Sequence, residues 1–370
     1  MRICHLLDRT ATWEHRVAIS QLLDRLPSAQ CTGVAAAIDL HRASQVHRAI
    51  GPVHALPNLG AAALTGAMVA RYADREGVDL IHAWGPFAAQ AASAARRPVV
   101  AELFDPALAA ASVKALRTVH RSRGFGVVCA SAVVRRRLIE GGFPLDGCAL
   151  VRPAVDFGWV RGARREPLRD ALGIAPDDFV VIVPDPVTRE SGAFDTVWAA
   201  ALLNHLDQKV RVILPGHSLE QRRVERFAAG LPTENPIVHG AGSYAFEDML
   251  VHSDALVVAA RGDVSTTCIA WAMAAGVAVI GAATYAVAEL ASHKVGGLLF
   301  KPPLRGSSAP AVVRLLRDRE AQAKAKEVAR GQAYEVFGLR RFVEQHLRVY
   351  DNLLAGRQVG DGIVDSAQAG

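Results

Sequence analysis

Short apolar segments alternate with helix-length segments along the whole chain, and this alternation limits the fold more than any other feature. Residues 157–178 are charged and rich in Gly and Pro, which is typical of a linker, and the pattern restarts after them. Strands that alternate with helices at this spacing predict parallel, doubly wound α/β sheets. The expected strands lie at residues 1–7, 31–38, 79–84, 98–105, 126–130, 148–151, 179–184, 210–215, 236–240, 255–259, 277–280 and 297–300.

The length of 370 residues supports a division into two parts, because a single hydrophobic core seldom grows to this size. We predict two tandem Rossmann-like domains at residues 1–158 and 159–337. A helix at 338–357 then returns to the first domain, and 358–370 form a tail. Ligands of doubly wound sheets bind at the carboxyl ends of the strands, so the cleft between the domains is the expected site.

The net charge of +6 lies entirely in the first domain, because residues 1–158 contain 18 Lys and Arg against 12 Asp and Glu. Such an excess favours an acidic ligand or an anionic lipid surface, and a solvated basic face is the simpler alternative. Nucleic-acid binding is not expected, since no aromatic interleaving or reader motif accompanies the charge. The basic face of the expected helix 107–123 carries Lys114, Arg117, Arg121 and Arg123.

The five cysteines are scattered, with no C-x-x-C pair and no Cys/His cluster of metal-binding spacing. We therefore expect buried free thiols, a reducing cytoplasmic compartment and no metal. The first residues, M-R-I-C-H-L-L-D, do not form a signal peptide. Residues 264–288 contain no charge, but Gly276 and Gly281 divide them into pieces too short to span a membrane.

Residues 261–281 form the segment with the clearest chemistry: a loop, a helix start, a buried helix, a glycine turn and a short strand. Ser265, Thr266 and Thr267 offer hydroxyl oxygens where the helix begins, which is typical of helix capping. A helix N-terminus presents free backbone N–H groups and can bind a phosphate. The alternative is a core helix and strand without a ligand.

Four segments together resemble the retaining glycosyltransferases of family 4, which have the GT-B fold. The resemblance covers most of residues 127–355, and the last helix is similar to the helix with which that family returns to its first domain. Residues 272–281 match the family's Ala-Met-Ala-x-Gly turn. The other three segments are C-A-S-A-V-V-R-R-R-L-I-E-G-G-F-P…V-R-P-A-V-D at 129–156, I-V-H-G…S-D-A-L-V-V at 237–258 and A-E-L…V-G-G-L-L-F-K-P-P at 288–303.

The resemblance implies a donor site on the second domain. It places Asp263 where the family carries a carboxylate near the donor sugar, and Glu289 in the family's Pro-Glu-Val motif. Arg189 stands in the loop whose cations grip the donor diphosphate. The family's ribose-binding Glu is replaced here by Trp271, and an indole cannot accept the ribose hydroxyl bonds.

The first domain also departs from the family. Phe104 occupies the place of the family's His, and His82 on the preceding strand is the nearest histidine. The glycine-rich loop expected after the first strand reads R-T-A-T-W-E-H-R and contains no glycine.

The expected function is metal-independent transfer of a sugar, with retention, from a nucleotide-sugar substrate to an unknown acceptor, with no cofactor. The donor would sit on the second domain, and the acceptor on the basic first domain, in peripheral contact with an anionic membrane. The replaced residues keep a second reading open, in which the chain is an inactive binding or scaffold protein. A sugar-nucleotide epimerase is a weaker third.

Overall fold

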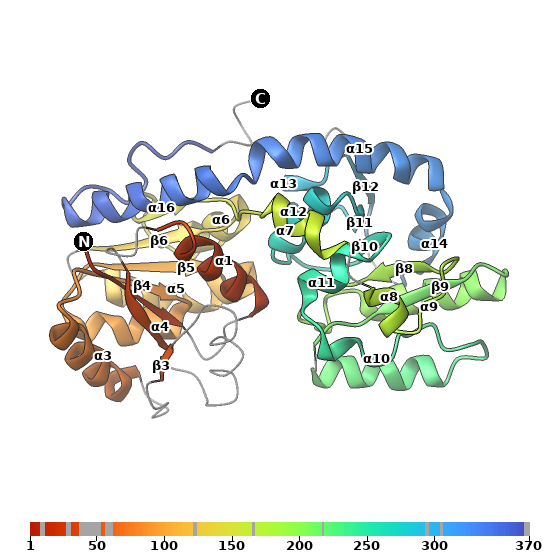
Figure 1. Cartoon of the computed structure of the whole chain (residues 1–370), viewed down its shortest axis with the longest axis horizontal. Helices are drawn as coiled ribbons and strands as arrows, with labels where there is room; N and C mark the ends of the chain where they lie inside the picture. Colours follow the sequence, from red (N-terminus) through yellow and green to blue (C-terminus); the bar gives the residue numbers. More distant parts are fainter. Residues whose placement is uncertain are drawn as a thin grey trace. The chain divides into compact units, whose positions relative to one another are not determined.

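The chain folds into two compact units (Figure 1). Unit 1 comprises Met1–Ala154 and Gly338–Gly370, and unit 2 comprises Val155–Phe337. Each unit is a parallel sheet with helices on both faces, so the predicted α/β fold class of two doubly wound sheets is confirmed. The computed structural model describes residues 1–7, 12–26, 31–36, 53–55, 62–120, 124–164, 167–216, 218–292, 296–303 and 306–365.

The sheet of unit 1 has the order β3-β2-β1-β4-β5-β6-β7, and every neighbouring pair is parallel. The order reverses between β1 and β4. The three residues V-H-A of β3 were not predicted, because so short a segment carries no readable alternation. The strands are β1 Ile3–Leu7, β2 Cys31–Ala36, β3 Val53–Ala55, β4 Leu80–Trp84, β5 Val99–Leu103, β6 Phe125–Cys129 and β7 Cys148–Leu150.

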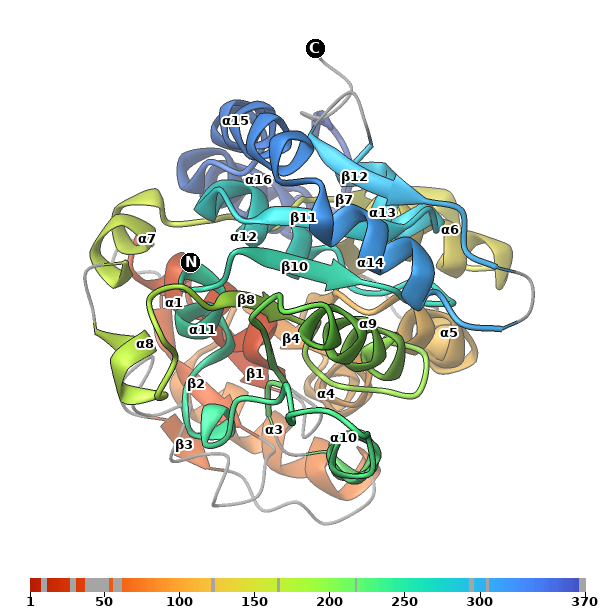
Figure 2. The same cartoon turned by 90° about the vertical axis from the view of Figure 1, so that its right-hand side faces the viewer.

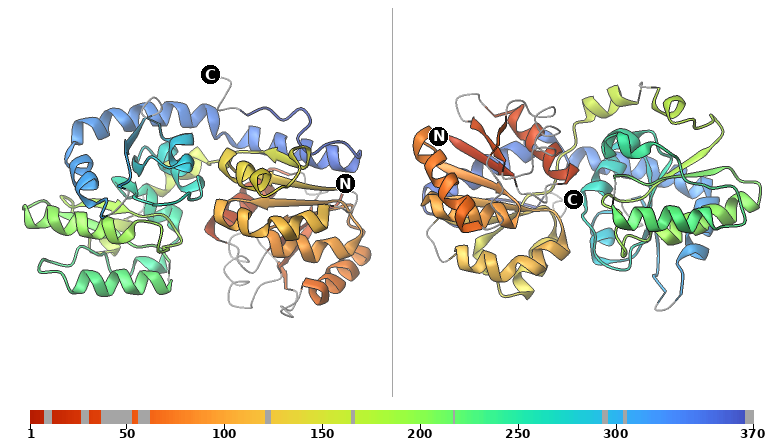
Figure 3. Two further views of the ribbon diagram at one scale, coloured as in Figure 1. Left: turned by 180° about the vertical axis from the view of Figure 1, so that it is seen from behind. Right: turned by 90° about the horizontal axis from the view of Figure 1, so that it is seen from below.

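Two hydrophobic clusters cover the two faces of this sheet. Helices α3 to α6 pack on one face, and the helices coloured orange lie in front of the strands in the back view (Figure 3). Helices α1 and α16 pack on the other face. The helices are α1 Trp13–Leu23, α3 Ala62–Glu76, α4 Pro86–Ala92, α5 Pro106–His120, α6 Ala132–Glu140 and α16 Leu339–Leu354, with short 3-10 turns at Ser93–Ala95 and Leu145–Gly147.

Helix α16 therefore returns to the first unit, as predicted. Its side chains Phe342 and Tyr350 are fully buried against the sheet of unit 1. Cys4, Cys129, Cys148 and Cys268 are buried and form no disulfide among the described residues, as predicted.

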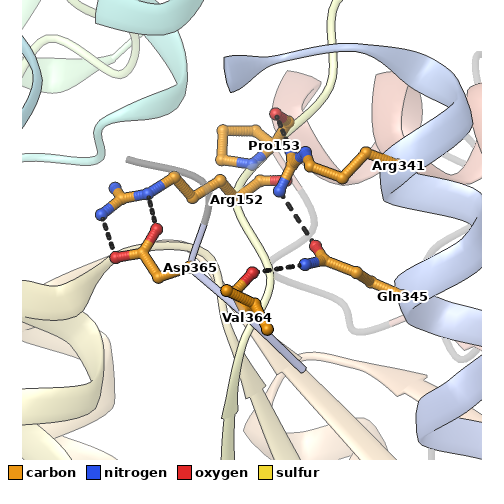
Figure 4. A network of polar contacts seen from close by, with 6 residues as sticks. All are labelled: Arg152, Pro153, Arg341, Gln345, Val364 and Asp365. Carbon is orange, nitrogen blue, oxygen red and sulfur yellow. Dashed lines mark hydrogen bonds and ion pairs between the residues drawn. The ribbon is translucent and has the colours of Figure 1, made fainter. Parts of the chain in front are cut away.

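A polar network joins Val364 and Asp365, which follow α16, to Arg152 near the end of the Met1–Ala154 part of unit 1 (Figure 4). Arg152 donates from Nε and Nη2 to the two oxygens of Asp365, at 2.7 and 2.9 Å. Arg341 donates to the carbonyl of Arg152 at 2.9 Å and to Oε1 of Gln345 at 2.9 Å. Gln345 in turn donates to the carbonyl of Val364. Burial, and then the charge of Arg152, lower the pKa of Arg341 to about 10.

We expect Arg152→Ala to lower the free energy of unfolding by about 1.5–3 kcal/mol, because it removes two charge-assisted hydrogen bonds from an almost buried guanidinium. Urea unfolding followed by circular dichroism measures the loss. The matched control is Arg340→Ala on the exposed face of α16, where Arg340 forms a solvent-exposed ion pair with Glu344. Equal unfolding midpoints for wild type and Arg152→Ala would show that the network contributes nothing.

The sheet of unit 2 has the order β12-β11-β10-β8-β9, again parallel throughout (Figure 2). The predicted strand 236–240 is wrong, since only Ile237 forms a single bridge, with Val212. Pro236 has no N–H to donate, and Gly240 turns the chain with a φ of 78°. The strands are β8 Phe179–Ile182, β9 Val210–Ile213, β10 Ala255–Val258, β11 Ala278–Ala282 and β12 Gly297–Phe300.

Helices α9, α10 and α14 cover one face of this sheet, and α12 and α15 pack against the other. The predicted linker contains two short helices, α7 and α8. The carboxylate of Asp156 accepts from the Gly158 and Trp159 amides and starts the first of them. Asp318 separates the helices Ala309–Arg317 and Arg319–Val336, and its carboxylate caps the second of them. The helices are α7 Phe157–Ala163, α8 Leu168–Ala171, α9 Ala193–His205, α10 Leu219–Ala229, α11 Phe246–Val251, α12 Thr267–Ala275, α13 Tyr285–Leu290, α14 Ala309–Arg317 and α15 Arg319–Val336, with a 3-10 turn at Ala241–Ser243.

Within the described part of the chain, none of the helices is both long enough and apolar enough to cross a bilayer.

Candidate functional site

The candidate site lies where the strand order of unit 2 reverses, between β8 and β10. The loops that leave these two strands at their carboxyl ends lie against each other, because the amide of Arg261 donates to the carbonyl of Glu190 at 3.1 Å. Gly192 at the start of α9 adopts a φ of 78°, and a Cβ there would lie 2.2 Å from the carbonyl oxygen of Ala259. Reversal points of doubly wound sheets are where such folds bind ligands.

Helix α12 starts at this edge and follows in sequence the loop that leaves β10. The hydroxyl of Ser265 accepts from the Thr267 amide at 3.3 Å and donates to the Thr267 hydroxyl at 3.2 Å. Ala270 makes the first four-residue helical bond, to the carbonyl of Thr266. The helix ends at Gly276, which has a φ of 63°. The predicted helix start at Ser265, Thr266 and Thr267 is therefore present, with Thr266 as the N-cap residue and the Ser265 hydroxyl bonded to Thr267 at the first helical position.

Thr266 differs from its two neighbours. Its side chain is fully buried, and its hydroxyl has no hydrogen-bond partner among the described residues. A buried hydroxyl without a partner costs about 1–3 kcal/mol, so such groups are uncommon in folded proteins. This hydroxyl stands at the N-terminus of α12, where the helix dipole favours negative charge.

Asp263 lies on the loop before α12, but its hydrogen bond leads to the next helix. Its Oδ1 accepts from the amide of Ala286 in the first turn of α13, at 3.2 Å. Glu289 is half-buried on the same six-residue helix. The structure therefore joins the loop carrying Asp263 to the helix carrying Glu289.

Arg189 lies on the loop after β8 and is exposed. Among the described residues, no hydrogen bond joins its side chain to the other candidate residues. The six candidates thus come from three neighbouring strand ends of one sheet edge. Ser265 and Thr267 contact each other directly, whereas Arg189 is brought near through its loop.

Trp271, at the position where the resembling family has a ribose-binding Glu, is 2% exposed in the core of unit 2. Its ring meets that of Trp159 on α7 edge to face, with centroids 5.4 Å apart. The indole therefore packs α12 against α7.

Phe104 and His82 lie in the core of unit 1. Phe104 is 2% exposed, and its ring stacks with Trp84 at a centroid distance of 6.5 Å. His82 is fully buried, and its Nδ1 shares a hydrogen bond of 2.8 Å with the hydroxyl of Tyr350. Burial is the largest cause that lowers the pKa of His82.

The basic face of the helix 107–123 is partly described. Lys114 and Arg117 are exposed on α5, and Arg121 and Arg123 lie outside the described residues.

A small cavity of about 110 Å³, which sequence reasoning did not single out, opens at the end of β9 in unit 2. It is lined in part by Gln221 and by residues 237–243, and the only signal for it was the glycine pair in G-A-G-S at 240–243.

Comparison with known proteins agrees with this geometry. Residues 164–332 match the family model "Glycosyl transferases group 1". The matched region lies within unit 2. The matched region spans all six candidate residues, from Arg189 to Glu289. No curated protein sequence matches the chain.

Solved structures show the GT-B fold of the whole chain. HepE from Anabaena, crystallised with UDP and glucose, aligns with a TM-score of 0.78 at 20% identity, over 95% of this chain and 100% of HepE. A glycosyltransferase from Rickettsia africae aligns with a TM-score of 0.73 at 14% identity, over 95% of this chain and 98% of the Rickettsia protein. Sucrose-phosphate synthase from Thermosynechococcus elongatus aligns with a TM-score of 0.70 at 15% identity, over 96% of this chain and 100% of the synthase. At these identities the similarity shows the fold.

Proposed function

We propose that the protein is a glycosyltransferase that moves a sugar from a nucleotide-sugar donor to an acceptor, with retention and without a metal ion in the reaction. One observation carries the proposal: the reversal point of the unit 2 sheet, which holds the candidate residues, lies inside the region that matches the glycosyltransferase group 1 model. Position and family model thus point to the same sheet edge.

The chemistry follows from the charge that develops as the bond to the sugar breaks. The departing diphosphate becomes more negative, and the backbone N–H groups of the first α12 turn, the Thr266 and Thr267 hydroxyls and Arg189 would stabilise it. The sugar gains oxocarbenium character, and the carboxylate of Asp263 would stabilise that positive charge. Glu289 would hold the donor sugar from α13.

A uridine nucleotide is the first donor to test, because HepE was crystallised with UDP-glucose as well as with UDP. The acceptor would bind unit 1, whose part of the sequence carries the charge excess. The exposed Lys114 and Arg117 of α5 would favour an anionic acceptor or membrane surface.

A second function, binding without catalysis, is favoured by one observation. Trp271 fills the core and packs on Trp159, at the position where the resemblance expects a carboxylate for the ribose. A donor would then lose one of its hydrogen-bonding partners, and the chain would serve as a binding or scaffold protein with the GT-B fold.

A thermal-shift panel of nucleoside diphosphates and sugar nucleotides tests donor binding. A ligand present at about 100 times its Kd stabilises the native state by about 2.7 kcal/mol and raises the melting temperature. We expect one nucleotide class to raise it, with inorganic phosphate as the matched control that lacks base and ribose. A panel without any stabilising nucleotide would contradict both the transferase and a nucleotide-binding scaffold.

We expect Thr266→Val to weaken nucleoside diphosphate binding about tenfold without lowering stability. Valine keeps the buried shape and removes a hydroxyl that has no partner among the described residues, so the folded state loses no hydrogen bond in that part of the chain. Titration calorimetry with the nucleotide that gives the largest thermal shift measures the affinity. Unchanged affinity would remove Thr266 from the donor site. The control variant is Thr196→Val. The hydroxyl of Thr196 donates to the carbonyl of Gly192, so its loss should lower the free energy of unfolding.

A further inference from the structure

A second cluster of chemically capable side chains lies in the core of unit 1, between its sheet and α16. His82 comes from β4, Glu102 from β5 and His346 from α16, and all three are fully buried. Nε2 of His346 lies 2.9 Å and Nε2 of His82 lies 3.0 Å from Oε2 of Glu102. One nitrogen of each ring and one carboxylate oxygen all lie within 4.8 Å of one another.

The outer nitrogen of each histidine contacts an oxygen. Nδ1 of His346 lies 2.8 Å from the carbonyl of Phe342, and Nδ1 of His82 lies 2.8 Å from the hydroxyl of Tyr350. A carbonyl only accepts, so the proton of His346 resides on Nδ1. A histidine that donates from Nδ1 to an oxygen presents the lone pair of Nε2, and this is the usual arrangement of histidines that bind metals.

Two polar atoms of the cluster form no hydrogen bond to any described residue. The 3.0 Å contact between Nε2 of His82 and Glu102 lies outside hydrogen-bonding geometry, and this nitrogen has no hydrogen-bond partner among the described residues. Within the same part of the chain, Oε1 of Glu102 also has none. Two polar atoms without hydrogen bonds in a fully buried place are costly, and a cation between the three side chains would satisfy both.

We propose that His82, Glu102 and His346 hold one zinc ion, through Nε2 of each histidine and both oxygens of the carboxylate. Zinc takes four nitrogen and oxygen ligands at about 2.0–2.2 Å. Calcium and magnesium prefer oxygen ligands alone. A nitrogen and an oxygen ligand, each about 2.1 Å from the ion and at a tetrahedral angle to each other, stand about 3.4 Å apart, so the present 2.9 and 3.0 Å contacts between the Nε2 atoms and Oε2 have to open by only a few tenths of an ångström. The two oxygens of the chelating carboxylate stand closer together than this and share one side of the ion.

The ion would have a structural role. All four ligand atoms come from protein, and the three residues are closed off from solvent, as in structural zinc sites. The bonds would fasten α16, whose His346 is 264 residues beyond His82, to two central strands of the sheet in unit 1. The site is on a different unit from the donor loops, so it does not depend on the proposed reaction.

Metal analysis of the purified full-length chain tests the proposal. The chain is produced with zinc in the medium and purified without a metal-affinity tag or chelator, and metals are measured by inductively coupled plasma mass spectrometry. We expect one zinc ion per chain. Removal with dipicolinate should lower the melting temperature, and added Zn²⁺ should restore it.

Variants locate the ion. Glu102→Gln and His346→Gln should lose the zinc, whereas Tyr350→Phe should keep it with an affinity about 10–100 times weaker, because only an outer partner is lost. His252→Gln on unit 2 is the matched control and should keep zinc at the wild-type level. If the ligand variants do not fold, cobalt substitution of the wild type should give the visible absorption bands of a four-coordinate site.

Two results would overturn the proposal. One is wild-type protein with less than about one zinc ion per ten chains whose melting temperature responds to neither chelator nor Zn²⁺. The cluster would then be a metal-free network in which protonated His346 pairs with Glu102. The other is a different metal, bound in stoichiometric amount and lost in the ligand variants, which would overturn the assignment to zinc.

Discussion

Replacing Asp263 with Asn is expected to lower the rate of donor turnover by about 10²–10³-fold. The carboxylate would stabilise positive charge on the sugar in the transition state, and the amide carries no charge to do so. The asparagine Oδ1 can still accept from the Ala286 amide, so the tie between the loop and α13 remains. Release of nucleoside diphosphate from the donor measures the rate, and the melting temperature should stay at the wild-type value.

The control for this change is Asp170→Asn, which neutralises an exposed carboxylate of α8 in the same unit. We expect its turnover to match the wild type. Asp263→Ala should lose both the turnover and the hydrogen bond to Ala286, and therefore some stability. Full turnover in Asp263→Asn would remove Asp263 from the reacting centre and leave it as a residue that holds α13.

Replacing Gly297 with Ala is expected to destabilise unit 2 by more than about 3 kcal/mol. A Cβ at this position would lie 1.6 Å from the carbonyl oxygen of Ala291 and 2.4 Å from its carbonyl carbon. Neither partner can move freely, because Gly297 starts β12 in register with β11 and its amide donates to the carbonyl of Ser292. Urea unfolding followed by circular dichroism measures the effect.

Gly331→Ala is the matched control, since a Cβ there meets nothing within 4 Å on the exposed side of α15. Alanine in a helix is about 0.5–1 kcal/mol more favourable than glycine, so this variant should be slightly more stable than the wild type. A Gly297→Ala protein with the wild-type midpoint would show that the approach of β12 to Ala291 is not as tight as described.

The alternation of strands and helices predicted most of the fold, because both sheets are parallel and buried on both faces, so each strand reads as an apolar run. The prediction failed where a single residue or a very short segment, rather than the alternation, determines the local structure. The strand predicted at 236–240 contains Pro236, which cannot donate, and only Ile237 bridges. The strand Val53–Ala55 is too short to be seen. Asp156 starts a helix at the beginning of the segment that its charge and its Gly and Pro content had assigned to a linker.

The helix start within the candidate donor site was readable because Ser265, Thr266 and Thr267 are consecutive. All three lie at the start of α12, and hydroxyl side chains at a helix start are a local sequence signal. The bond from Asp263 to the amide of Ala286 was not readable, since it depends on how α13 packs beside the loop.

The histidine and glutamate cluster of unit 1 could not be predicted from spacing. His82, Glu102 and His346 are far apart in the sequence, and only the return of α16 onto the sheet brings them together. A search for metal ligands at short spacing therefore finds nothing. Sequence reasoning singled out His82 only as the nearest histidine to an expected catalytic position, and the structure places it in the core.

The most direct test of the proposed function is the release of UDP from a panel of UDP-sugars incubated with the full-length chain, followed with a coupled assay. A glycosyltransferase should release UDP from at least one donor faster than the uncatalysed background, by slow transfer to water, and Asp263→Asn should slow this release about 10²–10³-fold. Saturable binding of donors with no release from any of them would contradict the transferase and favour a binding protein with the GT-B fold.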